Sequence, residues 1–398
     1  MRKQERDTLV VPSPTPSTPT ARPAPAKRRI ASLDWARGWM LIASVSVNSL
    51  LVIPAWFGHA SWEGVNPIDW IFPTFVTLSG CGLAFALGRV VRPGPLIKRF
   101  VVLMLVGLVY NAVISWSLDV FTWRISGVLQ LYAVLVALIS FMHLVTKTWQ
   151  GWAVITALLA LGHSYIILSY GRGCPAGVTT PTCNPSGVLD SVVFSSAHMY
   201  SGGAAGYDPE GVVVIMGALV SAAAGATVGH LLRALSNRAQ ETGSGPKNAI
   251  LPLIAAVVYF LALAFFLKYI FPVFFGADLP IMKKLWTAPF ALILASTTTA
   301  ALLLGHLMLD RNNVSPWFKT LNYPLVSLGR NSLFVYFGSH VLTSLLNRPF
   351  FDGQSVSGAF LDLFPSVLPA QVVWTAIMLA FWIPLATWMN TRRIYLRP

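Results

Sequence analysis

Apolar runs long enough to cross a lipid bilayer recur along nearly the whole 398-residue chain, and they constrain its fold more than any other feature. A transmembrane helix needs about 20 mostly apolar residues. Only 11% of the residues are charged, too few to cover a water-facing surface, since soluble domains carry roughly 25%. We therefore predict an all-α fold, a polytopic membrane bundle of about ten transmembrane helices. The predicted spans are 36–56, 68–88, 100–118, 125–145, 150–169, 211–232, 249–271, 287–308, 321–346 and 366–389.

The net charge of +14 is explained by topology rather than by nucleic-acid binding. If the N-terminus is inside, most of the 28 Lys and Arg residues fall in cytoplasmic segments. Because positively charged loops resist translocation, this asymmetry predicts that both termini are cytoplasmic. The same cations also suit anionic lipid or a phosphorylated donor molecule. We expect a multi-pass protein of the cell inner (plasma) membrane.

The chain divides into a tail and a membrane domain. Residues 1–29 form a basic, Pro-rich segment without an apolar core, which we expect to be a disordered cytoplasmic tail. Residues 30–398 form the membrane domain, with a long extracytoplasmic loop at 170–210. Cys174 and Cys183 lie in that loop, where either a disulfide or two free thiols fits the sequence.

Ionisable residues inside membrane spans are costly and usually serve a purpose. In the first predicted span, Asp34, Arg37 and Asn48 share one helix face, because each residue advances the helix by about 100°. Asp34 and Arg37 are three residues apart and can pair. We interpret that pair first as a structural brace at the cytoplasmic helix end.

The segment that follows the first span gathers groups suited to acid–base chemistry. His59, Trp62, Glu63 and Asp69 fall within eleven positions at the predicted outer interface. A histidine titrates near neutral pH, and a neighbouring carboxylate can orient it, which favours general-base activation of an amine or hydroxyl. A structural role for this cluster fits the residues equally well. The sequence holds no metal-ligand spacing and no phosphate-binding loop, so we predict no metal site.

Other polar residues stand at or near the ends of the later spans. Arg124 and Gln130 bracket the outer start of the fourth span, and Lys283 and Trp286 precede the eighth. Arg330 and Asn331 lie within the ninth, with His340 near its outer end. The predicted substrate-binding set is Trp62, Arg124, Gln130, Lys283, Trp286 and Asn331.

Several of these segments, in this order, resemble one family. They are SLDWARG at 32–38 with Asn48, HASWEG at 59–64, DWIFP at 69–73, RISGVLQ at 124–130, GCPAG at 173–177, YDPEG at 207–211, KKLW at 283–286 and NSLFVY at 331–336. They look like the catalytic region of heparan-alpha-glucosaminide N-acetyltransferase and its bacterial relatives. The resemblance covers nearly all of the membrane part.

The resemblance implies a transfer of acetyl from cytoplasmic acetyl-CoA to an amino sugar across the membrane. It makes His59 the catalytic residue and Asn48 its partner. Asp69, Glu63 and Asp34 are expected in supporting roles. The donor's pantetheine arm would thread the bundle, with Arg37 as the candidate for holding its nucleotide. A homodimer is also implied.

The chain departs from the family pattern at three places. Glu63 stands where the animal enzyme has Asn, Arg330 stands where Met is usual, and GSH at 338–340 replaces the expected GHE. Glu63 would favour a cationic amine as acceptor. The composition looks bacterial, so the expected acceptor is a sugar or glycan of the cell envelope rather than heparan sulfate.

The sequence thus predicts a transmembrane acyltransferase that takes acetyl-CoA, or another acyl-CoA, as donor and acylates an amine or hydroxyl of an extracytoplasmic sugar. The alternative is a transporter or flippase for an envelope glycan precursor, with Arg124, Lys283 and Arg330 along its path. A binding or scaffold subunit that has lost the chemistry is a third interpretation.

Overall fold

The structure is a computed structural model, and it describes residues 30–54, 56–87, 91, 93–200, 206–242, 249–310, 314–351 and 353–396. The tail at 1–29, expected to be disordered, lies outside the described residues. The α-helices are α1 Ala31–Asn48, α2 Ile71–Ala86, α3 Pro93–Ser115, α4 Val128–Val145, α5 Trp149–Gly171, α6 Pro185–Phe194, α7 Val212–Thr242, α8 Ile250–Phe265, α9 Ala288–Gly305, α10 Pro316–Leu321, α11 Tyr323–Arg330, α12 Ser332–Leu346, α13 Val356–Leu361 and α14 Val367–Thr391.

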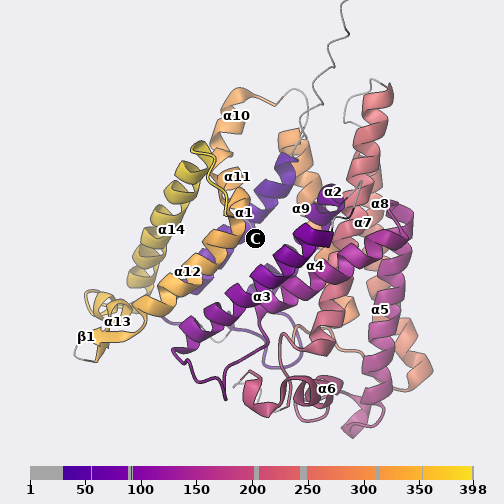
Figure 1. The fold of residues 1–398 in the computed structure, drawn as a ribbon, viewed down its shortest axis with the longest axis horizontal. Helices are drawn as coiled ribbons and strands as arrows, with labels where there is room; N and C mark the ends of the chain where they lie inside the picture. Colours follow the sequence, from indigo (N-terminus) through magenta and orange to yellow (C-terminus); the bar gives the residue numbers. More distant parts are fainter. Residues whose placement is uncertain are drawn as a thin grey trace, which may run out of the picture. The chain divides into compact units, whose positions relative to one another are not determined.

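Short elements complete the fold. The 3-10 helices are η1 Pro67–Trp70, η2 Pro175–Gly177, η3 Ser196–His198 and η7 Phe271–Phe275, and the π-helices are η6 Phe266–Ile270 and η8 His306–Asp310. One antiparallel hairpin joins β1 Pro349–Phe351 to β2 Gln354–Ser355. The prediction of an all-α membrane bundle is therefore confirmed. Figure 1 places α10 and α6 at opposite ends of this bundle.

Within the described residues, eight helices are long and apolar enough to cross a membrane. Two of the ten predicted spans differ from the prediction. The first ends at Asn48 rather than at 56, because Pro54 cannot continue a helix and the Gln371 side chain binds the amide of Leu51 instead, at 2.6 Å. The ninth is broken at Asn331 into α11 and α12.

Small residues let the central helices approach closely. A Cβ at Gly80 of α2 would lie 1.9 Å from the carbonyl oxygen of Ala222 on α7, and one at Gly225 of α7 equally close to that of Thr77. In the same way, a Cβ at Gly329 of α11 would lie 1.8 Å from the carbonyl oxygen of Asp34 on α1. Glycine is thus required where these backbones touch, as is usual between helices in membranes.

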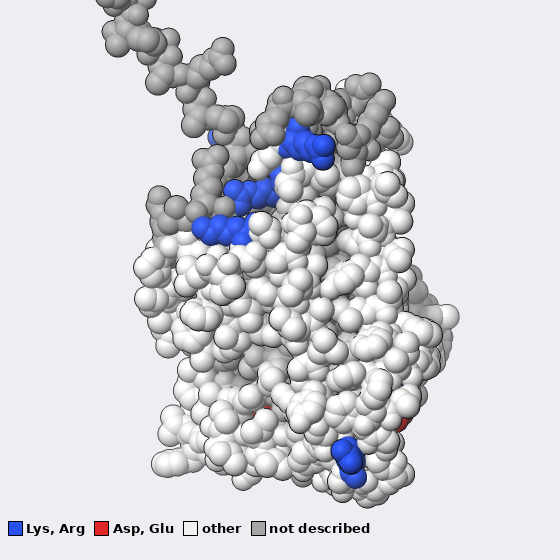
Figure 2. All heavy atoms as spheres, turned by 90° about the vertical axis from the view of Figure 1, so that its right-hand side faces the viewer, with Lys and Arg blue, Asp and Glu red and all other residues white. Residues whose placement is uncertain are grey.

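The outer surface matches a lipid environment. On the face drawn in Figure 2, Lys and Arg gather toward one end, and a broad belt without charged side chains lies below them. Large apolar side chains such as Leu105, Leu158 and Leu251 are exposed on α3, α5 and α8. Exposing such an apolar belt to water is unfavourable, whereas the hydrocarbon of a bilayer can cover it without that free-energy cost.

Candidate active site

The loop between α1 and α2 brings His59 against Asp69. Nδ1 of His59 lies 2.5 Å from Oδ1 of Asp69, while the backbone amides of Asn66 and Ala60 donate to Oδ2 at 3.0 and 3.3 Å. Asp69 stands at the third position of η1, where its carboxylate completes a capping box with Asn66. The Asp69 side chain is 1% exposed and that of His59 is 46% exposed. The aspartate is thus fixed, and it presents a histidine whose ring remains accessible.

This geometry selects one tautomer of His59. Because Asp69 accepts from Nδ1, the neutral ring carries its hydrogen there and keeps the lone pair on Nε2. A histidine held in this way can take a proton from an amine or hydroxyl while the carboxylate stabilises the resulting cation. Of the two carboxylates expected to support His59, the structure brings Asp69 to it, and Glu63 is exposed.

Lys283 lies beside the same pair. Its Nζ is 3.4 Å from Oδ1 of Asp69 and 3.2 Å from Nδ1 of His59. Burial lowers the pKa of Lys283 below its ordinary value, an effect that the Asp69 and Glu210 carboxylates only partly offset. The loop that carries Lys283 is held to the His59 loop by a hydrogen bond from Gly64 N to Ile281 O of 3.1 Å.

Trp62 follows His59 in the sequence, and Trp286 follows Lys283. A hydrogen bond fixes each of the two indole rings. The indole of Trp62 donates to the carbonyl of Thr179 at 2.9 Å and meets the Tyr207 ring edge-on at 5.2 Å. The indole of Trp286 is fully buried and donates to Oγ of Ser221 at 3.0 Å. Trp62, partly exposed, is therefore free to meet a ligand with its ring, whereas Trp286 packs in the protein interior.

Asn48 is positioned by α12. Its Nδ2 lies 3.0 Å from Nδ1 of His340 and 3.4 Å from Oγ of Ser44. Nδ1 of His340 also lies 2.8 Å from the carbonyl oxygen of Tyr336. The predicted span 36–56 extends eight residues beyond Asn48, and this is wrong, because α1 ends at Asn48 itself. His340, displaced by one position from the family pattern, is the residue that meets it.

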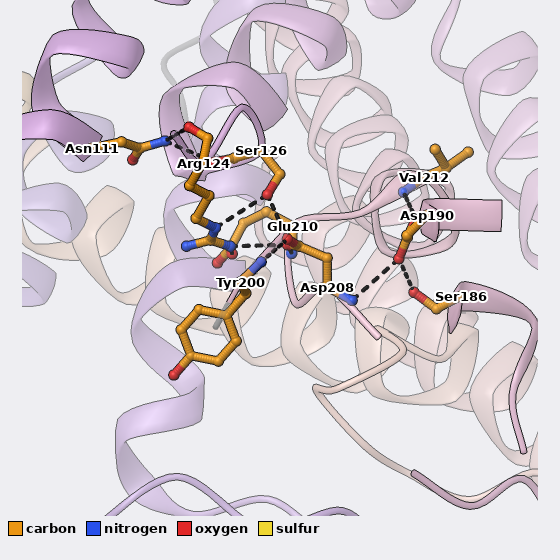
Figure 3. A network of polar contacts seen from close by, with 9 residues as sticks. All are labelled: Asn111, Arg124, Ser126, Ser186, Asp190, Tyr200, Asp208, Glu210 and Val212. Carbon is orange, nitrogen blue, oxygen red and sulfur yellow. Dashed lines mark hydrogen bonds and ion pairs between the residues drawn. The ribbon is translucent and has the colours of Figure 1, made fainter. Parts of the chain in front are cut away.

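A network of ion pairs surrounds Arg124 (Figure 3). Its Nη2 is 2.9 Å from Oδ1 of Asp208 and also contacts Glu210, and its guanidinium lies over the Tyr200 ring at 4.9 Å. Ser126 bridges Arg124 and Asp208 with hydrogen bonds of 3.1 and 2.5 Å. Burial alone would lower the pKa of Arg124, but the two carboxylates outweigh it and raise that pKa.

Asp190 of α6 extends this network on its other side. It accepts from the amides of Asp208 and Val212, at 3.2 and 2.7 Å, and from the hydroxyl of Ser186 (Figure 3). Candidate selection from the sequence missed Asp190, Asp208 and Glu210. The YDPEG segment was visible as part of the family resemblance, but nothing in one sequence pairs it with Arg124, more than eighty residues away.

Two predicted substrate ligands are buried amides. Gln130 is 5% exposed and Asn331 is 1% exposed, and neither the oxygen nor the nitrogen of either side chain has a hydrogen-bond partner among the described residues. Gln130 is confined by Gly107 and Gly127, where an added Cβ would lie 2.6 and 2.8 Å from its Oε1. Burying an amide without a partner costs about 1–3 kcal/mol, so these groups suit a ligand that supplies the missing bonds.

Asp34 and Arg37 form the expected pair, with 3.7 Å between Oδ1 and Nη1. Asp34 also accepts from Nε of Arg330 at 3.4 Å, and Arg37 donates to the carbonyl of Leu78 at 3.0 Å. Arg99 of α3 interacts electrostatically with Arg37, and its own Nε is buried without a described partner. Two cations thus lie near each other at this end of the bundle, an arrangement that suits an anion.

The loop at 170–210 is ordered in the described part. Cys174 and Cys183 form a disulfide, and Cys81 is a free, buried cysteine of α2. Among the described residues, no group of three His, Cys, Asp or Glu side chains is arranged to hold a metal.

Comparison with known proteins gives one family. A model described as "Heparan-alpha-glucosaminide N-acetyltransferase, catalytic" matches residues 29–185. The chain is 24% identical to heparan-alpha-glucosaminide N-acetyltransferase of Homo sapiens over 366 residues, which covers 79% of this chain and 53% of the relative. It is also 24% identical to the protein of the same name from Mus musculus, over 79% of this chain and 54% of that relative. The chain thus spans about half the length of the curated relatives it matches.

Proposed function

We propose that the chain, which is similar to heparan-alpha-glucosaminide N-acetyltransferase over most of its length, is a transmembrane acetyltransferase of that family. It would transfer acetyl from cytoplasmic acetyl-CoA to an amine or hydroxyl of an extracytoplasmic sugar or cell-envelope glycan. The observation that carries the proposal is the His59–Asp69 pair, which falls within the segment that the family model matches.

In the proposed reaction, Nε2 of His59 takes the proton of the acceptor as its nitrogen or oxygen attacks the thioester carbonyl. A bond forms between acceptor and acyl carbon, the carbon–sulfur bond breaks, and the proton passes from His59 to the departing CoA sulfur. Asp69 stabilises the His59 cation formed in between. Asn48 is the proposed donor to the developing oxyanion, or the group that orients the acceptor.

A covalent route uses the same residues. His59 Nε2 would attack the thioester first, and the acceptor would then attack the acyl-imidazole. A burst of CoA release in the absence of acceptor, equal to the enzyme present, supports this route. Its absence supports direct transfer in a ternary complex.

Buried polar groups are the proposed contacts of the donor inside the bundle. Arg37 and Arg99 offer positive charge for the phosphates of acetyl-CoA. The amides of Gln130 and Asn331 match the two amides of a pantetheine arm, each of which carries a donor and an acceptor. Acetyl-CoA is then a substrate rather than a resident cofactor.

We propose that the acceptor stacks on the ring of Trp62. The charge of Lys283 would then guide the approach of the acceptor to His59. We place the protein in the plasma membrane, with both termini cytoplasmic, and a homodimer is compatible with the family. Two predicted substrate ligands are given structural roles instead. The guanidinium of Arg124 is already engaged by two carboxylates, and the indole of Trp286 is fully buried and bound to Ser221.

The test is CoA release by purified protein in detergent, supplied with acetyl-CoA and with glucosamine or a panel of envelope glycans. His59→Ala should abolish acceptor-dependent release, and His198→Ala, a histidine of the outer loop bound to the Trp123 carbonyl, should leave it unchanged. The proposal fails if no acetyl-CoA is bound or consumed, or if His59→Ala retains wild-type activity. Movement of a glycan across liposomes without acyl-CoA would then favour a transporter.

A further inference from the structure

A cavity of about 530 Å³ lies beyond the C-terminal end of α8. Its lining comes from η6, η7 and the residues that follow them, together with Ala176 of η2. The amide of Asp278 donates to the carbonyl oxygen of Gly177 at 3.4 Å, so the two loops are joined there. Small-molecule sites measure roughly 300–1,000 Å³, and π-helices such as η6 often occur at functional sites. The proposed reaction uses none of the lining residues.

Lys268 and Asp278 form an ion pair in the lining of this cavity, with 2.7 Å between Nζ and Oδ1. The side chain of Lys268 is 20% exposed and that of Asp278 is 52% exposed. Their contact uses one of the three ammonium hydrogens and one of the two carboxylate oxygens. Lys268 also lies within Ile250–Phe275, a segment long and apolar enough to cross a membrane, where a cation is costly and usually functional. The cavity thus offers a positive and a negative group side by side.

A stripe of exposed apolar side chains runs along α8 to the cavity. Its members recur every three or four residues, are each between 43% and 76% exposed, and are Leu251, Ile254, Val258, Leu261, Phe265 and Tyr269. At 1.5 Å per residue the stripe is about 27 Å long, close to the thickness of bilayer hydrocarbon, about 30 Å. Tyr269 both ends the stripe and lines the cavity. Lipid chains that cover this face of α8 therefore lead to the ion pair.

We propose that the cavity binds the headgroup of phosphatidylethanolamine, with its phosphate on Lys268, its ammonium on Asp278 and its acyl chains along the α8 stripe. A zwitterionic headgroup replaces one ion pair by two and leaves neither side chain without a partner. Tyrosine, the residue type at the rim, is enriched at the headgroup level of membranes.

Two other common headgroups match the cavity less well. Phosphatidylglycerol supplies a phosphate but no cation, so it would compete with Asp278 for Lys268. Phosphatidylcholine supplies both charges, but its quaternary ammonium has no hydrogen to donate to the carboxylate. The expected preference is therefore for a lipid that carries both a phosphate and a primary ammonium.

The test is native mass spectrometry of purified, delipidated protein in detergent, titrated in turn with the three lipids carrying identical acyl chains. The wild type should bind phosphatidylethanolamine with a Kd about tenfold below the other two, the equivalent of one charged hydrogen bond. Asp278→Asn should reverse the order of phosphatidylethanolamine and phosphatidylglycerol, because Lys268 then favours the lipid with a net negative charge. The control Asp362→Asn removes an exposed carboxylate that binds Gln354 and should keep the wild-type order.

Equal Kd values for the three lipids in the wild type would overturn the proposal, since the ion pair would then not select the headgroup. An unchanged order in Asp278→Asn would do the same. Glycerophosphoethanolamine, the same headgroup without acyl chains, should compete only weakly. If it displaces the lipid at equal concentration, the cavity takes a soluble zwitterion and the lipid proposal fails.

A photoreactive phosphatidylethanolamine bound to the wild type gives a second readout if Asp278→Asn does not fold. Cross-linking within residues 266–278, mapped by peptide mass spectrometry, supports the inference, and cross-linking only elsewhere contradicts it. Neither measurement uses acetyl-CoA, so both are independent of acetyltransferase activity.

Discussion

The amide nitrogen of Asn48 lies 3.0 Å from Nδ1 of His340, although 292 positions separate the two residues in the chain. Asn48 ends α1, and His340 lies in the middle of α12, so this contact fixes the C-terminal end of α1 against α12. It also restrains the amide that we propose as the oxyanion donor.

If that restraint matters, Asn48 and His340 act as a unit. Asn48→Ala should lower kcat by about 10²–10³, as removal of an oxyanion donor does. His340→Ala should lower it less, and the double variant should be no worse than Asn48→Ala alone. The measurement is acetyl transfer by the four proteins of this cycle. Fully additive losses would show that the two residues act independently.

Asp69→Asn should leave the loop folded but lower kcat by about 10²–10⁴, because the amide no longer holds His59 in the required tautomer or stabilises its cation. The matched control is Glu63→Gln, which neutralises an exposed carboxylate four residues from His59. We expect that control to change kcat by less than about tenfold. Equal losses of kcat in Asp69→Asn and Glu63→Gln would contradict the proposal that Asp69 orients His59 and stabilises its cation.

The lowered pKa of Lys283 predicts a pH effect on activity. Lys283 loses its proton below the ordinary lysine value of 10.5, and the positive charge beside Asp69 is then lost as pH rises through the lowered pKa. Activity should therefore decline on the alkaline side below pH 10.5 in the wild type. Lys283→Arg keeps its charge at much higher pH and should move this decline upward. The control Lys284→Arg should leave the pH of this decline unchanged. If Lys283→Arg also leaves it unchanged, the decline is caused by the titration of a group other than Lys283.

Arg124→Met should destabilise the protein by about 2–4 kcal/mol, because it leaves the carboxylates of Asp208 and Glu210 without their cation in a largely buried setting. Thermal unfolding in detergent measures this loss. The control is Lys268→Ala, which removes an ion pair with Asp278, a side chain that is 52% exposed, and should cost less than about 1 kcal/mol. Similar losses in the two variants would contradict the bracing role of Arg124.

Sequence reasoning located the parts of the site that are local in the chain. Asp34 with Arg37, three residues apart, and His59 with Asp69, ten apart, were both identified as groups, because helix periodicity and a short loop bring them together. The number of membrane helices was nearly reproduced from apolar run length. The end of α1 was missed because its apolar run continues through Val52 and Ile53, beyond the last helical residue.

The long-range contacts could not be derived from one sequence. Lys283 was selected as a substrate ligand, but its place beside Asp69 depends on how the loop before α9 packs on the loop after α1. The meeting of Asn48 with His340 depends in the same way on α12. Apolar patterning identifies the helices and their approximate lengths. Which helices pack against each other depends on close contacts at glycine residues, and the glycines in the sequence are compatible with many different helix pairs.

Gln130 offers a test in which stability and function should change in opposite directions. Its amide is buried without a described partner and is confined by Gly107 and Gly127, so the empty protein carries an unsatisfied polar group. Gln130→Met keeps the volume and removes that cost, and should raise the unfolding temperature. If the amide serves the pantetheine arm, the same variant should raise KM for acetyl-CoA by about tenfold, the equivalent of one lost hydrogen bond. Ser140→Ala, which removes an unpartnered hydroxyl from the same helix, should stabilise the protein without changing KM. A Gln130→Met protein that is more stable and has an unchanged KM would exclude Gln130 from the donor path.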